Sequence, residues 1–189
     1  MFGHCDCAKA DKDRIEAKSG LPHQRVILNE GYSELYTDVT HIEESELIFD
    51  FKTESAAVNE VFTGVAHYAA HVKDELEQLA KGYPALQIDL RPLPEMEYRK
   101  RRTIALGRAK EYAPVVGKGG VEFERMALMS LHGGIDHERH MCKVLAEEEP
   151  EPGLRKFLLD TEQHLDAWYE RIDVLLNRDY FRQPNTAAH

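Results

Sequence analysis

The sequence has few cysteines and no long apolar run. Its 189 residues include three cysteines, Cys5, Cys7 and Cys142, and an odd, sparse count argues against a disulfide framework and suits a reducing compartment. No apolar run reaches the roughly 18 residues that a membrane helix needs. The first residues also lack the basic start and apolar core of a signal peptide. We therefore expect a soluble, cytoplasmic protein without a membrane span.

The sequence also has no excess of basic residues. Acidic side chains number 34 against 24 lysines and arginines, which gives a formal net charge of −10. Nonspecific attraction to nucleic acid is therefore not expected. One basic cluster, residues 99–102, runs against this trend, and we interpret it as the solvated face of a helix.

Complete catalytic motifs are absent from the sequence. The glycines of segment 117–120 are not followed by Lys-Ser or Lys-Thr and come after a helical pattern, so they do not form a phosphate-binding loop. No serine or cysteine has a recognisable nucleophile setting, and Cys142 falls on an apolar line where a small core residue is expected. The dimetal carboxylate signature needs Glu-x-x-His on two helices, and this spacing occurs nowhere in the chain.

Hydrophobic periodicity predicts helices along most of the chain. Apolar residues recur at three- and four-residue intervals from His23 onward and again over 54–82, 121–148 and 154–177, and a more polar pattern covers 95–112. Glycine and proline separate these stretches, and neither a hairpin nor a strand-helix alternation is present. The pattern therefore predicts an all-α bundle. The two clearest seams are Val58, Val61, Phe62, Val65, Ala69, Val72, Leu76 and Leu79, and Leu154, Phe157, Leu158, Thr161, Leu165, Trp168, Ile172 and Leu175.

The chain divides into one domain and two tails. We expect a flexible N-terminal tail over residues 1–22, a single helical bundle domain over 23–178 and a C-terminal tail over 179–189. His4, Cys5 and Cys7 fall in the first tail, where they could bind a soft metal together, although an incidental reactive tail is the simpler interpretation.

Two helix-opening segments resemble those of a known family. Gly119–Arg125 and Pro152–Phe157 are similar to segments of an uncharacterised family of ferritin-like helical bundle proteins, many of them predicted to be exported. The resemblance covers roughly residues 117–176. It implies an antiparallel four-helix bundle of ferritin-like type, with an additional N-terminal helix or tail.

In that family each of the two helices carries a histidine. The first of these positions matches His137 if about two residues are inserted here, at Gly133 and Gly134. The second position aligns with Trp168, and the nearest histidine is His164, one turn earlier. This chain also lacks the export signal, so the resemblance implies a fold and leaves the activity open.

The stretch from Leu131 to Met141 concentrates polar residues in the middle of a predicted helix. Metal sites in helical bundles use histidines and carboxylates three or four residues apart, because successive turns then direct their ligands to one point. Consecutive helices joined by a short break are normally antiparallel neighbours, so we predict a transition-metal site shared by two helices, with a hydrogen-bonded or exposed polar stripe as the alternative. Its residues are His132, Asp136, His140, Asp160 and His164.

Other polar residues of these helices allow further predictions. Glu124 and Glu138 fall on an apolar line, and a buried carboxylate is costly unless it is paired or ligates an ion; their burial stays open. A glycine inside a helix destabilises it by about 1 kcal/mol relative to alanine, and we expect a kink or a close helix contact to explain Gly133–Gly134. His67 and His71 lie opposite an apolar seam, so we expect them to be solvated.

Two functions are compatible with these patterns. The lack of a complete catalytic signature favours a non-enzymatic helical bundle that acts as a structural or partner-binding module or as a homo-oligomer. The alternative is a metal-binding bundle that holds iron, zinc or copper for storage, sensing or oxygen chemistry.

Overall fold

The structure is all-helical over the residues it describes. The computed structural model describes residues 21–44, 55–89, 96, 99–104, 107 and 120–181, and no strand occurs among them, which confirms the predicted all-α class. None of the helices in this part of the chain combines the length and apolar character needed to cross a bilayer. The elements are α2 (His23–Glu44), α3 (Ala56–Gly82), α5 (Val121–Glu148), α6 (Pro152–Leu175) and the π-helical turn η2 (Leu176–Tyr180).

Several predicted segments fall wholly or partly outside the described residues. Residues 99–104 are helical, as the 95–112 pattern predicts, but most of that stretch is not described. The N-terminal tail up to residue 20, the segment 45–54 and the tail from residue 182 also lie outside. The predicted helix start at residue 23 matches the start of α2, and the predicted helix end at residue 82 matches the end of α3.

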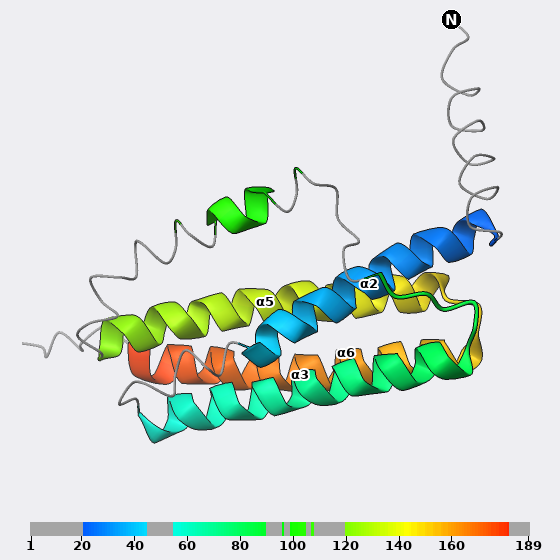
Figure 1. The fold of residues 1–189 in the computed structure, drawn as a ribbon. Helices are drawn as coiled ribbons and strands as arrows, with labels where there is room; N and C mark the ends of the chain where they lie inside the picture. The colour runs from blue at the N-terminus through cyan, green and yellow to red at the C-terminus, as the bar shows by residue number, and fades with distance from the viewer. Residues whose placement is uncertain are drawn as a thin grey trace, which may run out of the picture.

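The four long helices pack as successive neighbours. α5 lies along α6, α6 contacts α3, α3 contacts α2, and α2 crosses over α5. Helices that follow one another across the α2–α3 and α5–α6 connections run in opposite directions (Figure 1). The crossing of α2 and α5 therefore brings together side chains about a hundred residues apart in the sequence.

The predicted apolar seams form the core. On α3 every seam residue but one is buried, and Leu79 packs against the core from its edge. On α6 the only predicted seam residue that is not buried is Trp168, which also packs at the edge. Full burial of a Leu, Ile or Val side chain contributes about 1.5–3 kcal/mol, so these seams account for the packing of the helices. The largest fully buried side chains from the four helices include Tyr32, Leu35, Leu76, Leu128, Ile135, Leu158 and Ile172.

Two glycines allow helices to approach closely. A Cβ atom on Gly31 of α2 would lie 2.6 Å from Leu145 Cδ2 of α5, and a Cβ on Gly64 of α3 would lie 2.9 Å from Trp168 Cζ2 of α6. Helical periodicity places Gly64 opposite the apolar seam of α3, yet the indole of Trp168 covers this glycine.

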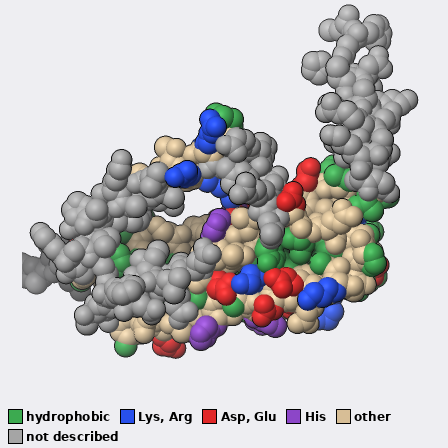
Figure 2. Space-filling model, in the orientation of Figure 1, with side chains coloured by type: hydrophobic (Ala, Val, Ile, Leu, Met, Phe, Trp, Pro, Cys, Tyr) green, Lys and Arg blue, Asp and Glu red, His purple; other side chains and the backbone are tan. Residues whose placement is uncertain are grey.

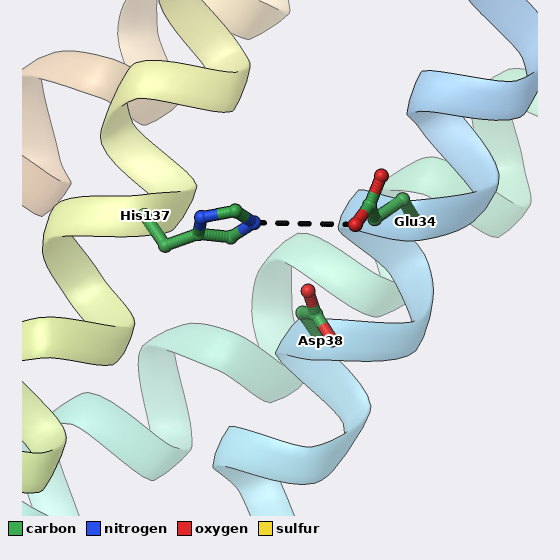
Figure 3. Close-up of side chains that lie close together, drawn as sticks. All are labelled: Glu34, Asp38 and His137. Carbon is green, nitrogen blue, oxygen red and sulfur yellow. Dashed lines mark ion pairs between the residues drawn. The ribbon is translucent and has the colours of Figure 1, made fainter. Parts of the chain in front are cut away.

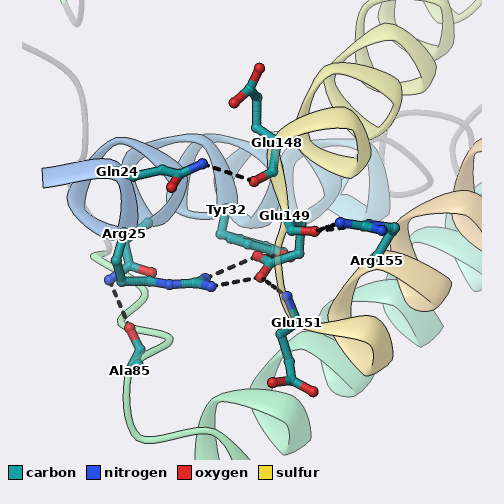
Figure 4. Close-up of polar contacts among 9 residues, drawn as sticks. Gln24, Arg25, Tyr32, Ala85, Glu148, Glu149, Glu151 and Arg155 are labelled. Carbon is teal, nitrogen blue, oxygen red and sulfur yellow. Dashed lines mark hydrogen bonds and ion pairs between the residues drawn. The ribbon is translucent and has the colours of Figure 1, made fainter. Parts of the chain in front are cut away.

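Glu149 fastens the junction between α5 and α6 to the start of α2 (Figure 4). Its side chain is 0% exposed and accepts two hydrogen bonds from the Arg25 guanidinium, at 2.9 and 2.6 Å. The Tyr32 hydroxyl and the Glu151 backbone N–H donate two more, both at 2.9 Å. Burial alone would raise the pKa of Glu149, but these donors hold the pKa below its ordinary value of 4.5. All of these donors are groups of the protein itself, and they connect the carboxylate to α2 and to the start of α6. Glu149 therefore has a structural role.

Glu124 has a comparable role at the other end of α5. The open question of its burial is answered, since it is 7% exposed. One carboxylate oxygen accepts a hydrogen bond from the Ser55 backbone N–H, just before α3, and the other accepts one from the Tyr180 hydroxyl in η2, both at 2.6 Å. Glu124 therefore joins three elements and has both oxygens satisfied.

Candidate metal centre

The predicted residues of α5 are engaged in separate local contacts. The His132 ring stacks on Tyr169 of α6, with centroids 3.9 Å apart. Asp136 accepts hydrogen bonds of 2.9 and 2.7 Å from Arg139, which lower the pKa of this carboxyl below its ordinary value. The ring of His140 lies 3.6 Å from the Asp136 carboxylate and is hydrogen-bonded to its backbone carbonyl oxygen. Of these three side chains, Asp136 and His140 form an ion pair, whereas His132 packs on α6.

The predicted residues of α6 are exposed and have partners of their own. Asp160 pairs with Lys156 one turn earlier. The His164 ring stacks on Tyr68 of α3, with centroids 5.2 Å apart, and is hydrogen-bonded to the Asp160 carbonyl oxygen. Within the part of the chain that the structure describes, no three of the five predicted residues place ligand atoms within 4.8 Å of one another. The structure does not bring the predicted set together, and metal binding by these residues stays a prediction.

A different group of ligand atoms converges where α2 crosses α5. Glu34 and Asp38, one turn apart on α2, face His137 of α5, and one ligand atom from each lies within 4.8 Å of the other two (Figure 3). Glu34 Oε1 is 4.0 Å from His137 Nε2. Donors bound at about 2.1 Å to one ion lie roughly 3–3.5 Å apart, so small rotamer adjustments would close this group around a cation. Such adjustments are accessible, because the His137 side chain is 55% exposed.

Arg101 pairs with both carboxylates of this group. Its guanidinium donates a 2.5 Å hydrogen bond to Glu34 Oε1 and bonds of 2.9 and 3.2 Å to the two oxygens of Asp38. Burial by itself would raise the pKa of Asp38, yet contacts with His41 and Arg101 hold it below its ordinary value of 3.8. The sequence placed residues 99–102 on a solvated face. For Arg101 this was wrong, because the residue pairs with α2.

Glu138, next to His137, is the buried member of the site. Its side chain is 2% exposed, and Oε2 has no hydrogen-bond partner among the described residues. Burial, the charge of Asp38 and a hydrogen bond to the Asp38 carboxylate raise the pKa of Glu138 well above its ordinary value of 4.5. A buried polar atom without a partner costs about 1–3 kcal/mol. Packing therefore does not explain why a carboxyl group occupies this position.

A cavity of about 770 Å³ opens beside these side chains. Gly133 and Gly134 form part of its wall, and among the residues that the structure describes a Cβ atom on either glycine would meet nothing within 4 Å. The expectation of a close helix contact at this glycine pair was therefore wrong. The cavity gives a small molecule access to the donors. Its polar lining includes Asp38, His41, Arg101, Ser130, His137 and Glu138, and its apolar lining Ile42, Ile104, Met126 and Met129.

The arrangement offers a divalent cation three or four donors. Glu34 and Asp38 supply carboxylate oxygens, and His137 supplies one imidazole nitrogen. The carboxyl group of Glu138, which is hydrogen-bonded to Asp38, would be the fourth donor. This donor set suits Fe²⁺, Mn²⁺ or Zn²⁺ better than Cu⁺, which prefers thiolate and thioether ligands. Coordination positions that the protein does not fill would face the cavity, as in metal sites that bind small molecules.

Sequence reasoning identified part of this group. The family resemblance matched a histidine position to His137, and the apolar line of α5 singled out Glu138. Glu34 and Asp38 were missed, although their four-residue spacing on a predicted helix was visible. Only the crossing of α2 and α5 shows that they face His137.

Comparisons with models of known protein families, with curated proteins and with solved structures found no match to this chain.

Proposed function

We propose that the protein is a metal-binding helical bundle that holds one first-row divalent ion between α2 and α5. The ligands are Glu34, Asp38, His137 and Glu138. The observation that carries the proposal is Glu138, whose buried Oε2 has no hydrogen-bond partner within the described part of the chain and which lies beside Glu34 and Asp38 of the converging group. A ligating carboxylate is one of the few arrangements that compensate for such burial.

The proposed architecture is a four-helix bundle of ferritin-like type. Its support is the successive packing of α2, α3, α6 and α5 and the resemblance of the segments that open the last two helices. The site differs from the dimetal signature, because it contains one histidine and uses adjacent residues of α5 in place of a Glu-x-x-His pair. We therefore propose a single ion, bound reversibly for storage, sensing or oxygen chemistry.

A structural or partner-binding role, favoured by the sequence, is the alternative. On the face shown in Figure 2, acidic and basic side chains are interspersed among hydrophobic ones. This surface does not specify a partner, so the metal site has the more specific support.

Titration with Mn²⁺ tests the proposal, with free ion measured by electron paramagnetic resonance. Mn²⁺ suits a carboxylate-rich site and binds poorly to soft thiolates, so Cys5 and Cys7 compete little. We expect one site per chain in the wild type. His137→Ala removes the imidazole ligand and should weaken Mn²⁺ binding at least tenfold. Even substitutions of residues that only hydrogen-bond to metal ligands typically reduce metal affinity about 10–100-fold.

His140→Ala is the matched control, because His140 is an exposed histidine on the same helix. It should bind as the wild type does. If His132→Ala and His140→Ala lose the ion while His137→Ala keeps it, the set predicted from the sequence is the site. If the wild type binds none of Mn²⁺, Fe²⁺ and Zn²⁺, the metal proposal fails and the structural role remains.

A further inference from the structure

The position that a metal ion would take near α2 is occupied by a positive charge of the chain itself. The Arg101 guanidinium bonds to Glu34 Oε1, the same atom that faces His137 Nε2, and to both oxygens of Asp38. The arginine side chain is 33% exposed, and the two carboxylates are 23% and 15% exposed. Its planar fork engages two carboxylates at once, which a lysine ammonium does less well.

We propose that Arg101 is a built-in competing cation, which a metal ion must displace from Glu34 and Asp38 in order to bind. This inference rests on the proposed function and adds a regulation of the same site. The displacement also breaks the hydrogen bonds that Arg101 makes from helical residues 99–104 to Glu34 and Asp38 of α2.

Two physical reasons make the guanidinium and the ion exclude each other. A lone pair that accepts a hydrogen bond from Arg101 cannot bind a metal at the same time, so an ion that uses these lone pairs of Glu34 Oε1 and Asp38 must break those bonds. A guanidinium and a dication held by the same carboxylates also repel each other strongly, since the site is partly shielded from water.

The competition makes the site selective. An ion that binds both carboxylate and imidazole gains enough to displace Arg101. Mg²⁺ dehydrates reluctantly and prefers oxygen ligands, so it should leave the arginine in place. The arginine thus raises the ion concentration at which the site fills, and filling changes the position of the 99–104 segment.

Mn²⁺ affinity in two charge variants tests the proposal. Arg101→Gln removes the competitor, and we expect it to bind Mn²⁺ about tenfold more tightly than the wild type, because charge-assisted hydrogen bonds no longer have to be broken. Arg102→Gln, at the exposed neighbouring residue, removes the same formal charge and should change affinity less than about twofold, as expected for a screened surface charge. Comparing the two variants separates the effect of losing the Arg101 hydrogen bonds on Mn²⁺ affinity from the effect of a general change in net charge.

Hydrogen exchange on the unmodified protein gives a second measurement that does not depend on how the variants fold. Backbone amides of residues 99–104 should exchange faster with Mn²⁺ than with Mg²⁺ or without metal. If Arg101→Gln and Arg102→Gln bind Mn²⁺ equally, or if the segment stays protected when the ion binds, the arginine does not compete, although the metal site stands. If the wild type binds none of Mn²⁺, Fe²⁺ and Zn²⁺, the proposed function itself fails.

Discussion

Replacing each of the two buried glutamates of α5 by leucine should have clearly different effects on stability. Glu124 and Glu138 lie on the same apolar line of one helix and are 7% and 2% exposed. Glu124 has both oxygens in hydrogen bonds with the fold, whereas Glu138 has one oxygen without a partner among the described residues. The same substitution therefore compares a carboxylate that holds the fold with one that does not.

The expected magnitudes follow from the partners left behind. Glu124→Leu removes the acceptor of the Ser55 N–H and of the Tyr180 hydroxyl, and unsatisfied donors cost about 1–3 kcal/mol each when buried. Ser55 is exposed and can turn to water, so we expect a loss of about 1–3 kcal/mol in total. Glu138→Leu replaces a half-satisfied buried acid with an apolar side chain, and Asp38 keeps its bonds to Arg101. We expect unfolding free energy to stay unchanged or rise by up to about 2 kcal/mol.

Urea denaturation of the metal-free protein at pH 7 measures both effects. For a chain of this size, 1 kcal/mol also corresponds to about 2–4 °C in Tm. If Glu138→Leu loses as much stability as Glu124→Leu, Glu138 is held by the fold, and the main observation behind the metal proposal disappears.

Two further predictions concern stability. Gly134→Ala should raise the free energy of unfolding by up to about 1 kcal/mol, since its Cβ meets open space among the described residues. Gly64→Ala should lower the free energy of unfolding by up to about 2 kcal/mol, because the clash with Trp168 costs about 1–3 kcal/mol. Equal Tm shifts for the two variants would mean that the indole does not cover Gly64. Glu149→Gln should cost about 3–5 kcal/mol at pH 7, because Arg25 then lacks its buried counter-charge. The native pKa of Glu149 lies below its ordinary value of 4.5, so its contribution is complete above pH 4.5 and is lost as pH falls through the native pKa; urea curves of wild type and variant should converge in acid, and a constant difference down to pH 2 would contradict this assignment.

Periodicity alone predicted the helices and most of the core. The seams of α3 and α6 follow from the helical repeat, because burial on one face is a local property of the sequence. The same reasoning placed Cys142 correctly in the core, and it placed Glu138 on the apolar line of α5 without deciding whether the side chain is buried.

The site required knowledge of which helices cross. From the sequence we predicted a metal site between α5 and α6, since consecutive helices are usually neighbours. These two helices do pack together. However, the predicted line through His132 faces Tyr169, while His137 faces α2, about a hundred residues earlier in the chain. Periodicity indicates which residues share a face, but it does not indicate which helix covers that face. The same gap explains Gly64, whose neighbour Trp168 comes from another helix.

The most direct test of the metal proposal is the position of a bound ion. In crystals soaked with Zn²⁺, an anomalous difference map should show a peak between α2 and α5, about 2.0–2.2 Å from His137 Nε2 and from at least one oxygen of Glu34, Asp38 or Glu138. A peak beside His132, His140 or His164, or none between α2 and α5 at a Zn²⁺ concentration that saturates the protein in solution, would contradict the proposed site.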